Sequence, residues 1–350
     1  MKYSTLSTSD LKVSNLCLGS MTWGVQNSEQ EAHEQIEYAL SEGINFIDTA
    51  EMYPVPVQKD LQGKTETYIG SWLEKSGKRN DIILASKVAS KNQALSIGTR
   101  DASQGLTRDS IREALEGSLT RLQTDYLDLY QVHVPDRSLN NFGKRAYAHE
   151  PEHDGASIEE TLEALTELVK EGKVRHVGIS NESPWGTAEY LRLSREKELA
   201  RIVSIQNQYS LLNRTFEIGL SEFVFRENIG FLAYSALSMA VLTGKYLNGE
   251  KPAGARFTIS VSDKHRVRYN PASAQTAIER YVTLAREHGL DPAQIAIAFV
   301  LSRPFVTSVI LGATSIKQLK TDIDAAQVTL DAETLAGIDA IYKEHPDPTV

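Results

Sequence analysis

Short apolar segments alternate with helical segments along most of this chain, and this alternation restricts its fold more than any other feature. Strand–helix–strand repeats place their strands in parallel with right-handed crossovers, so the pattern predicts an α/β fold. The predicted strands cover residues 16–18, 46–48, 82–86, 127–132, 177–179, 203–205, 231–233 and 309–311. About eight units is the number that closes a (β/α)8 TIM barrel. A doubly wound open sheet satisfies the same alternation and stays open as the alternative.

Amphipathic segments between and after these strands predict the helices. Gly43 is placed to end the first helix, and Thr65 is placed to cap the start of the second. In the third helix, apolar residues such as Ile111 and Leu115 recur at helical spacing. The predicted helices cover residues 29–42, 65–76, 107–122, 157–171, 272–288, 292–302 and 332–342. The last three are additions to a minimal barrel, and two of them fall between the seventh and eighth strands.

The remaining segments are a short opening and several long connections. Residues 2–14 predict a β-hairpin around the polar turn Thr8-Ser-Asp10. No internal repeat or low-complexity linker interrupts the pattern, so we predict a single domain over residues 1–350. The long connections cover residues 54–64, 88–106, 134–156 and 238–270. The first three follow strands and are expected to overhang the active face, where loops set substrate specificity.

Charge and composition argue against some partners. A formal net charge of −9 and a pI near 5.5 disfavour nucleic acid or an anionic membrane as the main partner. No apolar run reaches transmembrane length and the first residues do not form a signal peptide, so the cytoplasm is the expected location. The single cysteine, Cys17, lies in an apolar run and is expected in the core. The oligomeric state is not predicted by these features.

Three predicted strands each deliver a titratable residue at the carboxyl end. Asp48 ends one strand, with Tyr53 five residues further along, Lys87 ends the next, and His133 ends a third. The carboxyl ends of parallel strands share one face of a barrel, and catalytic groups gather there. We therefore expect these four side chains to form one cluster.

The four residue types suit the reduction of a carbonyl group. That reaction needs a hydride donor, an acid for the developing alkoxide, and hydrogen-bond donors aimed at that oxygen. A free tyrosine has a pKa near ~10, and a neighbouring ammonium such as that of Lys87 would lower the pKa of Tyr53. Asp48 would keep the lysine charged, and His133 would orient the carbonyl oxygen or share a proton with the tyrosine. The cluster is therefore typical of a reductase.

These segments resemble the aldo-keto reductase superfamily. The resemblance is carried by residues 43–53, 82–88 and 126–135, which hold Asp, Tyr, Lys and His in the family's order, and it runs from about residue 1 to 345. Further support lies in the segments 178–181, 205–210 and 312–315, and residues 50–56 and 242–256 are similar to the bacterial Tas-type branch. The resemblance implies a (β/α)8 barrel that reduces a small aldehyde or ketone with NADPH, held extended and without a Rossmann domain.

The resemblance also implies a role for each matching residue. Asp48, Tyr53, Lys87 and His133 match the catalytic tetrad, with Tyr53 as general acid, and Asp48 also borders the cofactor. The positions that match the nicotinamide site are Ser180, Asn181 and Gln206 for the carboxamide and Tyr234 for the ring. The other cofactor positions are Gly19, Ser20 and Met21 after the first strand, Ser235, Leu237, Lys245 and Arg256 along the pyrophosphate, and Gly312, Thr314, Gln318, Thr321 and Asp322 at the adenosine and 2′-phosphate. The last group resembles a helix N-terminus, a natural anion site.

Asp322 departs from the family pattern, in which asparagine often stands at this position. A carboxylate pointing at the 2′-phosphate would weaken NADPH binding, although Lys317 or Lys320 would compensate. NADPH is therefore the first expectation and NADH the alternative.

Other functions stay open on sequence grounds. One is a cofactor-occupied regulatory subunit like the potassium-channel β subunits, which carry asparagine where this chain has His133. Another is an aldolase-like barrel in which Lys87 forms a Schiff base. The segment 149–154 has the composition of a metal site, but Pro151 argues against a helical ligand pair, so we predict no metal site.

Overall fold

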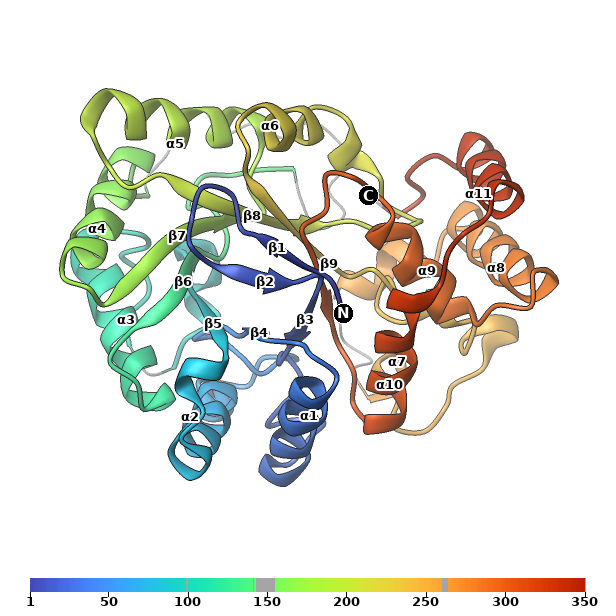
Figure 1. The fold of residues 1–350 in the computed structure, drawn as a ribbon, viewed down its shortest axis with the longest axis horizontal. Helices are drawn as coiled ribbons and strands as arrows, with labels where there is room; N and C mark the ends of the chain where they lie inside the picture. Colours follow the sequence, from blue (N-terminus) through green and yellow to red (C-terminus); the bar gives the residue numbers. More distant parts are fainter. Residues whose placement is uncertain (99, 141, 143–154, 260–263, 350) are drawn as a thin grey trace.

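The computed structural model describes residues 1–98, 100–140, 142, 155–259 and 264–349. Its centre is a closed barrel of eight parallel strands (Figure 1). The first barrel strand pairs with the last, Leu16 with Val309, which closes the ring. This closure confirms the predicted (β/α)8 barrel and excludes the open sheet. The barrel strands are β3 (Leu16–Gly19), β4 (Phe46–Asp48), β5 (Ile83–Val88), β6 (Leu127–Val132), β7 (Val174–Ser180), β8 (Ile202–Gln208), β9 (Gly230–Tyr234) and β10 (Ser308–Leu311).

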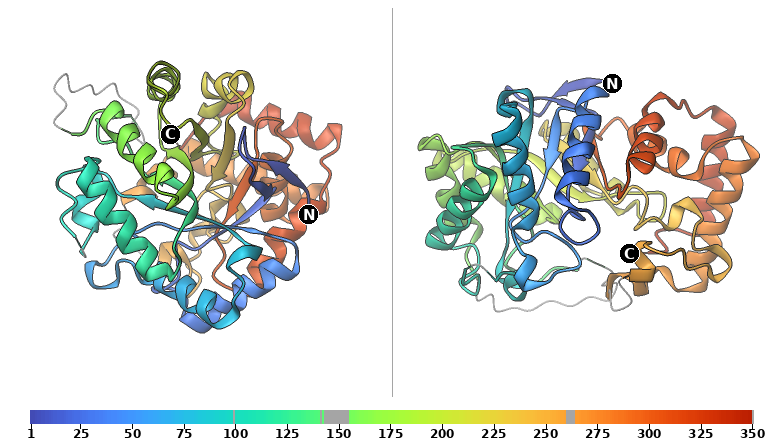
Figure 2. Two further views of the ribbon diagram at one scale, coloured as in Figure 1. Left: turned by 60° about the vertical axis from the view of Figure 1, so that its left-hand side comes forward. Right: turned by 90° about the horizontal axis from the view of Figure 1, so that it is seen from below.

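Helices cover the outside of the barrel, as the two further views in Figure 2 also show. Those in the connections before β9 are α1 (Glu29–Ser41), α2 (Lys64–Ser76), α3 (Arg108–Leu122), α4 (Ile158–Lys170), α5 (Pro184–Lys197) and α6 (Leu220–Arg226). Those after β9 are α7 (Arg256–Ile259), α8 (Ala272–Glu287), α9 (Pro292–Leu301), α10 (Ile316–Asp324) and α11 (Ala332–Glu344). The predicted additions are therefore present, and α8 packs against α11 at one side of the ring (Figure 1).

Short 3₁₀-helices lie within the connections. They are η1 (Lys59–Leu61), η2 (Arg79–Asp81), η3 (Lys91–Ser96), η4 (Thr215–Glu217), η5 (Val241–Thr243), η6 (Leu247–Gly249), η7 (Lys264–Tyr269) and η8 (Ala325–Gln327). Six of them lie in the connections after β4, β5, β8 or β9, so the loops over the barrel mouth contain local helical turns.

The start of α2 differs from its prediction. The helix begins at Lys64 and is preceded by Gly63, whose φ of 81° lies in the left-handed region that glycine tolerates. Thr65 is inside the helix rather than at its cap, and its hydroxyl donates to the carbonyl of Trp23 at 2.7 Å. The threonine therefore ties α2 to the connection between β3 and α1. Gly43, by contrast, ends α1 as predicted, with φ 86°.

The opening hairpin closes the N-terminal end of the barrel. β1 (Tyr3–Thr5) pairs antiparallel with β2 (Lys12–Ser14), as predicted, and lies across the middle of the ring in Figure 1. Leu6 and Leu11 of the hairpin are buried and pack against side chains from the barrel interior. Those interior residues are Cys17, Phe46, Ile83, Ala85, Leu129, Val203 and Leu232. The lower half of the barrel is therefore an apolar plug.

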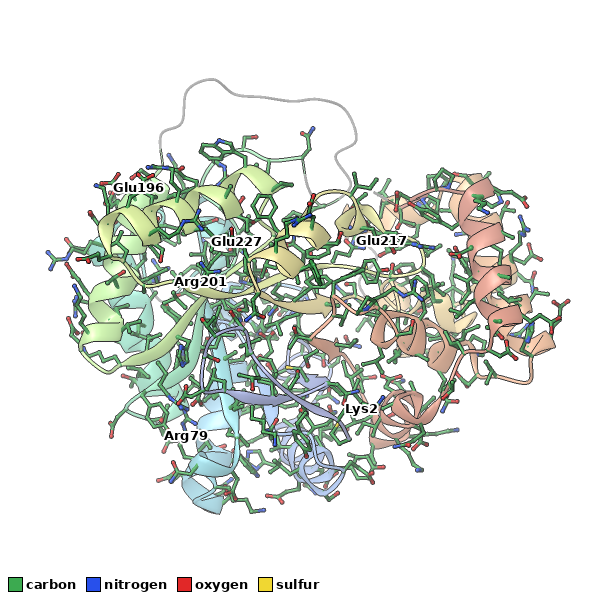
Figure 3. The ribbon with its side chains drawn as sticks, turned by 45° about the horizontal axis from the view of Figure 1, so that its top comes forward. Lys2, Arg79, Glu196, Arg201, Glu217 and Glu227 are labelled. Carbon is green, nitrogen blue, oxygen red and sulfur yellow. The ribbon has the colours of Figure 1, made fainter. Side chains whose placement is uncertain are left out.

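Ion pairs fasten elements together at this end and around the outside. Asp10, in the hairpin turn, lies 2.7 Å from both Arg175 and His176 of β7. On the outer layer, Arg201 and Glu227 approach to 3.3 Å, and Figure 3 labels both. Among the helices of the described residues, none is long and apolar enough to cross a membrane.

Candidate active site

The carboxyl ends of β4 and β5 bring an aspartate and a lysine together inside the barrel. Asp48 ends β4, Lys87 lies one residue before the end of β5, and both are buried. The Nζ of Lys87 is 2.5 Å from Oδ2 of Asp48 and donates to the carbonyl of Thr49 at 2.8 Å. Tyr53, in the connection after β4, places its hydroxyl 3.4 Å from the same Nζ. Lys87 is thus the centre of the cluster.

Two glutamines hold the other oxygen of Asp48. Gln206 of β8 donates to Oδ1 at 2.9 Å, and Gln131 of β6 donates to the same oxygen at 3.2 Å. Gln206 also donates to the Oε1 of Gln131 at 3.2 Å, which links β6 and β8 through the barrel centre. Sequence reasoning missed Gln131. Its signal was a polar residue within an apolar strand, two positions before His133 and so on the same face.

His133 borders Tyr53 from the end of β6. The two ring centroids are 5.7 Å apart, with the planes at 82°, an edge-to-face contact. Burial, and next the charge of Lys87, hold the pKa of His133 well below its usual range. The Nδ1 atom is buried without a hydrogen-bond partner among the residues that the structure describes. At neutral pH the ring is therefore uncharged and retains an unused hydrogen-bonding group.

The protonation states of Lys87 and Tyr53 follow from burial and mutual charge. Burial favours the neutral amine, but the Asp48 carboxylate and the Tyr53 hydroxyl outweigh it and raise the pKa of Lys87. Burial raises the pKa of Tyr53, and the Lys87 ammonium opposes that rise. At neutral pH the site therefore holds a charged lysine beside a protonated tyrosine.

A buried ion pair fixes the loop that carries Tyr53. The carboxylate of Glu51 receives two hydrogen bonds from Arg100, at 2.9 and 2.7 Å, and a third from the backbone of Ala89 at 2.6 Å. Gly63 donates its backbone N–H to the carbonyl of Tyr53 at 2.9 Å. The connections after β4 and β5 are therefore joined beside the cluster. Neither Glu51 nor Arg100 was predicted, because nothing local in the sequence couples positions so far apart.

Asp136 joins the connections after β5 and β6. Its carboxylate accepts backbone hydrogen bonds from Lys91 and Leu106, both at 2.7 Å, and from Ala156 at 3.1 Å. A Cβ on Gly105 would lie 2.3 Å from this carboxylate, so the close approach requires glycine there. Sequence reasoning missed this residue too, since an aspartate in a loop gives no sign of its distant partners.

The residues predicted to hold the nicotinamide lie beside the cluster. The hydroxyl of Ser180, which ends β7, donates to the carbonyl of Gln206 at 2.7 Å. The side chain of Asn181 donates to the carbonyl of His133 at 2.9 Å and accepts from the Tyr234 hydroxyl at 2.6 Å. The ends of β6, β7, β8 and β9 are thereby connected at one face.

The residues predicted around the first barrel strand also border the cluster. Gly19 ends β3, where a Cβ would lie 2.5 Å from the carbonyl oxygen of Leu311. Ser20 is buried and donates its hydroxyl to the carbonyl of Asp48 at 2.8 Å. The carbonyl of Met21 accepts from the backbone of Val55 at 2.9 Å, next to the Tyr53 loop.

The residues predicted along the pyrophosphate follow β9. Ser235 has a left-handed φ of 60°, and Leu237 packs partly buried against the main hydrophobic core. Burial lowers the pKa of Lys245, and the charge of Asp322 opposes that effect. Arg256 begins α7, and its charge acts on Tyr53. These cations therefore lie on the side of the mouth between the catalytic cluster and α10.

The residues predicted at the adenosine lie before and within α10. Gly312 and Thr314 precede the helix, Gln318 accepts from the backbone of Thr314 at 3.0 Å, and Thr321 lies in the second turn. A Cβ on Gly312 would meet no atom within 4 Å, so open space adjoins it. Asp322 is the exception to the predicted helix N-terminus, because it lies near the other end of α10 and is 4% exposed.

The lysine that offsets the charge of Asp322 also differs from the expected one. Burial, and next the charge of Asp291, raise the pKa of Asp322 to about 7, and Lys245 opposes that rise. Lys320 instead pairs with Asp324 at 3.3 Å. Lys245, from a different part of the chain, is therefore the cation that acts on Asp322.

Comparison with known proteins identifies the family. The model of the aldo/keto reductase family matches residues 15–343. The chain belongs to the aldo/keto reductase family. It is 51% identical to Protein tas of Escherichia coli over 99% of both chains, and 32% identical to the uncharacterized oxidoreductase YrpG of Bacillus subtilis over 98% of this chain and 96% of that one. It is also 29% identical to a probable voltage-gated potassium channel subunit beta of rice over 100% and 99% of the two chains.

Membership assigns the chain to a class of oxidoreductases. Aldo/keto reductases use nicotinamide cofactors and act on small carbonyl substrates. The cluster of Asp48, Tyr53, Lys87 and His133 lies at the carboxyl ends of the barrel strands, where enzymes of this fold carry their active sites.

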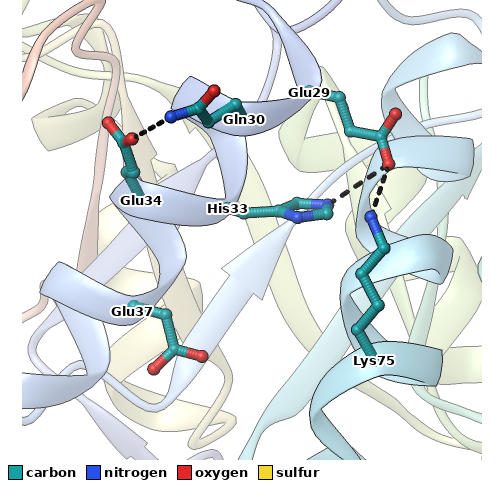
Figure 4. A pocket seen from close by; sticks show the side chains of 6 residues that line it. All are labelled: Glu29, Gln30, His33, Glu34, Glu37 and Lys75. Atoms are coloured by element: carbon teal, nitrogen blue, oxygen red, sulfur yellow. Dashed lines mark hydrogen bonds and ion pairs between the residues drawn. The ribbon is translucent and has the colours of Figure 1, made fainter.

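A pocket lies on the outer layer between α1 and α2 (Figure 4). It is lined by Glu29, Gln30, His33, Glu34, Glu37 and Lys75. Two of its carboxylates are already paired, Glu29 with Lys75 at 3.4 Å and Glu37 with Lys78 at 2.7 Å. Within the described ranges, no group of His, Cys, Asp and Glu could hold a metal ion, and the segment 149–154 lies outside those ranges. We therefore interpret this pocket as a surface groove between α1 and α2 in which charged side chains pair with one another across the two helices.

Proposed function

We propose that this chain is an NADPH-dependent reductase of aldehydes and ketones in which Tyr53 is the general acid. The observation that carries the proposal is the position of Lys87, 2.5 Å from Asp48 and 3.4 Å from the Tyr53 hydroxyl. An ammonium beside a phenol stabilises the phenolate that remains after proton donation, so it lowers the barrier for that transfer. Asp48 keeps the ammonium charged although it is buried.

The state of His133 supports the choice of acid. Its pKa is held well below the usual range by burial and then by Lys87, so at neutral pH the ring carries no proton to spare as an imidazolium. A neutral imidazole can still donate or accept one hydrogen bond per nitrogen. In the proposed reaction His133 therefore orients the carbonyl oxygen while Tyr53 donates the proton.

The residues of the mouth suit a nicotinamide dinucleotide. Ser180, Asn181 and Gln206 would hold the carboxamide, and Tyr234 would flank the ring. Ser235, Leu237, Lys245 and Arg256 would line the pyrophosphate, and Gly312, Thr314, Gln318 and Thr321 would border the adenosine and 2′-phosphate, beside the open space at Gly312. When bound, the nicotinamide supplies the hydride.

Asp322 decides how far NADPH is preferred over NADH. With a pKa raised to about 7 by burial, its carboxyl is largely uncharged in mildly acidic solution and does not repel a phosphate. The nearby Lys245 adds positive charge on the same side. NADPH is therefore the proposed cofactor, and NADH is the second candidate.

Two other functions were open on sequence grounds, a regulatory subunit and a Schiff-base aldolase. The likeness to the rice channel subunit favours a cofactor-occupied regulatory subunit as a second candidate. A Schiff base at Lys87 is disfavoured, because the raised pKa keeps the amine protonated and non-nucleophilic. Turnover distinguishes the first two, since a regulatory subunit would bind nucleotide without reducing aldehydes at an appreciable rate.

The test combines nucleotide binding with a single hydroxyl deletion. Fluorescence titration with NADPH and then NADH is expected to give saturable, NADPH-selective quenching. Reduction of an aldehyde, followed at 340 nm, is expected to fall by about 10²–10⁴-fold in Tyr53→Phe, while NADPH binding is retained. Tyr190→Phe, which alters a buried tyrosine of α5, is the control and should behave as wild type. Normal turnover in Tyr53→Phe would rule out the proposed acid, and binding of neither nucleotide would rule out the reductase.

A further inference from the structure

An arginine from the long segment after β9 reaches the barrel mouth. Arg268, in η7, donates through Nη1 to Oε1 of Gln208 at 2.9 Å. Gln208 is the last residue of β8, two positions beyond Gln206. Since alternate residues of a strand share a face, Gln208 continues the inward row above Gln206, which itself contacts Asp48. Arg268 therefore lies above the catalytic cluster.

Two hydrogen-bond donors at this point lack acceptors. The Nε of Arg268 and the amide nitrogen of Gln208 are both buried without a partner among the described residues. Because Oε1 of Gln208 accepts from the guanidinium, the orientation of the amide is set and its nitrogen faces away from Arg268. Buried donors without acceptors cost free energy, so an acceptor supplied by a ligand would be bound favourably.

The charge of Arg268 is also unbalanced. In the part of the chain that the structure describes, no carboxylate lies within 4 Å of the guanidinium, which instead lies 5.2 Å from the centroid of the Tyr269 ring. Burial raises the pKa of Tyr234, and the guanidinium of Arg268 opposes that rise, so its field reaches the predicted ring-flanking residue. Tyr234 in turn bonds Asn181, which bonds His133. The cation thus faces the reacting side of the mouth in a chain whose net charge is −9.

We propose that Arg268 and Gln208 form a subsite for an anionic oxygen group, a carboxylate or a phosphate, of a molecule bound at the active-site mouth. The inference rests on the proposed function for its setting and adds a specificity element that is separate from Lys245 and Arg256. A carbonyl substrate with a carboxylate at its far end would place that group on Arg268 and its carbonyl near Tyr53. A phosphate of the dinucleotide is the other source of the same chemistry.

The experiment compares two aldehydes that differ in charge. The probes are 4-carboxybenzaldehyde and its neutral methyl ester, methyl 4-formylbenzoate, together with terephthalate as a non-reacting dicarboxylate whose binding is measured by calorimetry. The variants are Arg268→Met, Arg268→Lys and Gln208→Leu. Arg226→Met, which removes an exposed cation of α6 paired with Glu222, is the matched control.

If the anion comes from the substrate, Arg268→Met raises KM for the acid and the dissociation constant of terephthalate by about tenfold or more, because a charge-assisted hydrogen bond is lost. The ester and the binding of NADPH are then unchanged, Arg268→Lys recovers part of the loss, and Gln208→Leu shows a smaller loss. If the anion is a cofactor phosphate, NADPH binding weakens by a similar factor and the two aldehydes are affected alike.

The proposal is overturned if Arg268→Met changes neither terephthalate binding nor NADPH binding relative to the Arg226→Met control. Thermal unfolding of each variant verifies that the fold is intact. Failure of the proposed function is distinguishable, because a wild-type protein that binds no nucleotide and reduces neither aldehyde can still be titrated with terephthalate. In that case, Arg268-dependent binding supports the subsite and its absence overturns it.

Discussion

The two ends of one barrel are built from the same strands and differ in almost every physical respect. At the N-terminal end, β4, β5 and β6 turn Phe46, Ala85 and Leu129 into the interior. Two residues further along, the same three strands turn Asp48, Lys87 and Gln131 inward. Because side chains alternate with a period of two, one pleat separates an apolar layer from a polar one.

The difference shows that separate layers of the barrel interior provide the stability of the fold and the reactive groups of the candidate site. The lower layer is stabilised by burial of apolar surface, at roughly 25 cal/mol per Å², and an unpaired charge there would lose its hydration without compensation. The upper layer holds a buried ion pair, whose desolvation offsets much of its Coulomb attraction. The polar layer can therefore be optimised for proton transfer because the apolar layer beneath it holds the barrel together.

The largest effect is expected from removing the cation of the upper layer. Lys87→Met leaves the Asp48 carboxylate buried without its partner, which typically costs about 3–5 kcal/mol of unfolding free energy. Turnover should be lost as well, since the tyrosine then has no neighbouring ammonium. Urea unfolding measures the stability and an aldehyde assay measures the turnover. The control is Lys78→Met, which removes one partner of an exposed ion pair and should change the free energy of unfolding by less than about 1 kcal/mol. A stable Lys87→Met variant would show that the pair contributes nothing to the fold.

A somewhat smaller effect, on stability alone, is expected from the lower layer. Leu11→Ala deletes a buried side chain of the plug, and such deletions cost about 2–5 kcal/mol. The strand ends that carry the cluster lie at the opposite end of the barrel, so kcat and KM of the folded protein should not change. The comparison fails if activity per folded molecule falls together with stability.

A third test uses the pH dependence of a buried carboxyl that lacks a close cation. Burial raises the pKa of Asp322 from 3.8 to about 7, so the folded state binds a proton more tightly than the unfolded state. Stability attributable to this group is therefore highest below about pH 4 and falls as the pH rises to about 7. Asp322→Asn removes that dependence and should stabilise the protein at pH 8 by up to about 4 kcal/mol relative to its effect at pH 4. Equal slopes of unfolding free energy against pH in both proteins would contradict the assignment.

The smallest effect is expected from the ion pairs that fasten the hairpin. Asp10 is largely exposed, so Asp10→Asn should cost less than about 1 kcal/mol despite its contacts with Arg175 and His176. The hydrogen bond from His176 lowers the pKa of Asp10, so this contribution is present at neutral pH and is lost as the pH falls through that depressed pKa. Thermal unfolding at low and high salt measures it. A loss as large as that of Leu11→Ala would mean that charge, rather than apolar burial, holds the hairpin in place.

The sequence predicted the parts of this molecule that depend on local pattern. Strand–helix alternation gave the barrel, and Asp48, Lys87 and His133 were found because each stands at the end of an apolar run. The residues that were missed have distant partners. Glu51 meets Arg100, and the carboxylate of Asp136 collects backbone groups from two other segments. Such contacts depend on how connections fold over the barrel, which no local pattern encodes.

The same reasoning explains the two local differences. Thr65 has a good capping side chain, but a contact with Trp23 across the fold uses its hydroxyl, and the helix begins at Lys64 after a left-handed glycine. Asp322 was placed at a helix N-terminus by resemblance, yet α10 begins at Ile316 and buries that aspartate near its other end. At Thr65 a tertiary contact outweighs the local capping signal, and the position of Asp322 along α10 differs from the one that the resemblance implied.

The pairing of β3 with β10 has a consequence for synthesis of the chain. Leu16 is among the first barrel residues to leave the ribosome, and its partner Val309 is among the last. Until β10 emerges, the nascent sheet has two free edges that could pair with other chains. The barrel therefore cannot close until nearly the whole polypeptide has been synthesised, and the exposed edges of β3 and its neighbours persist until β10 pairs with them.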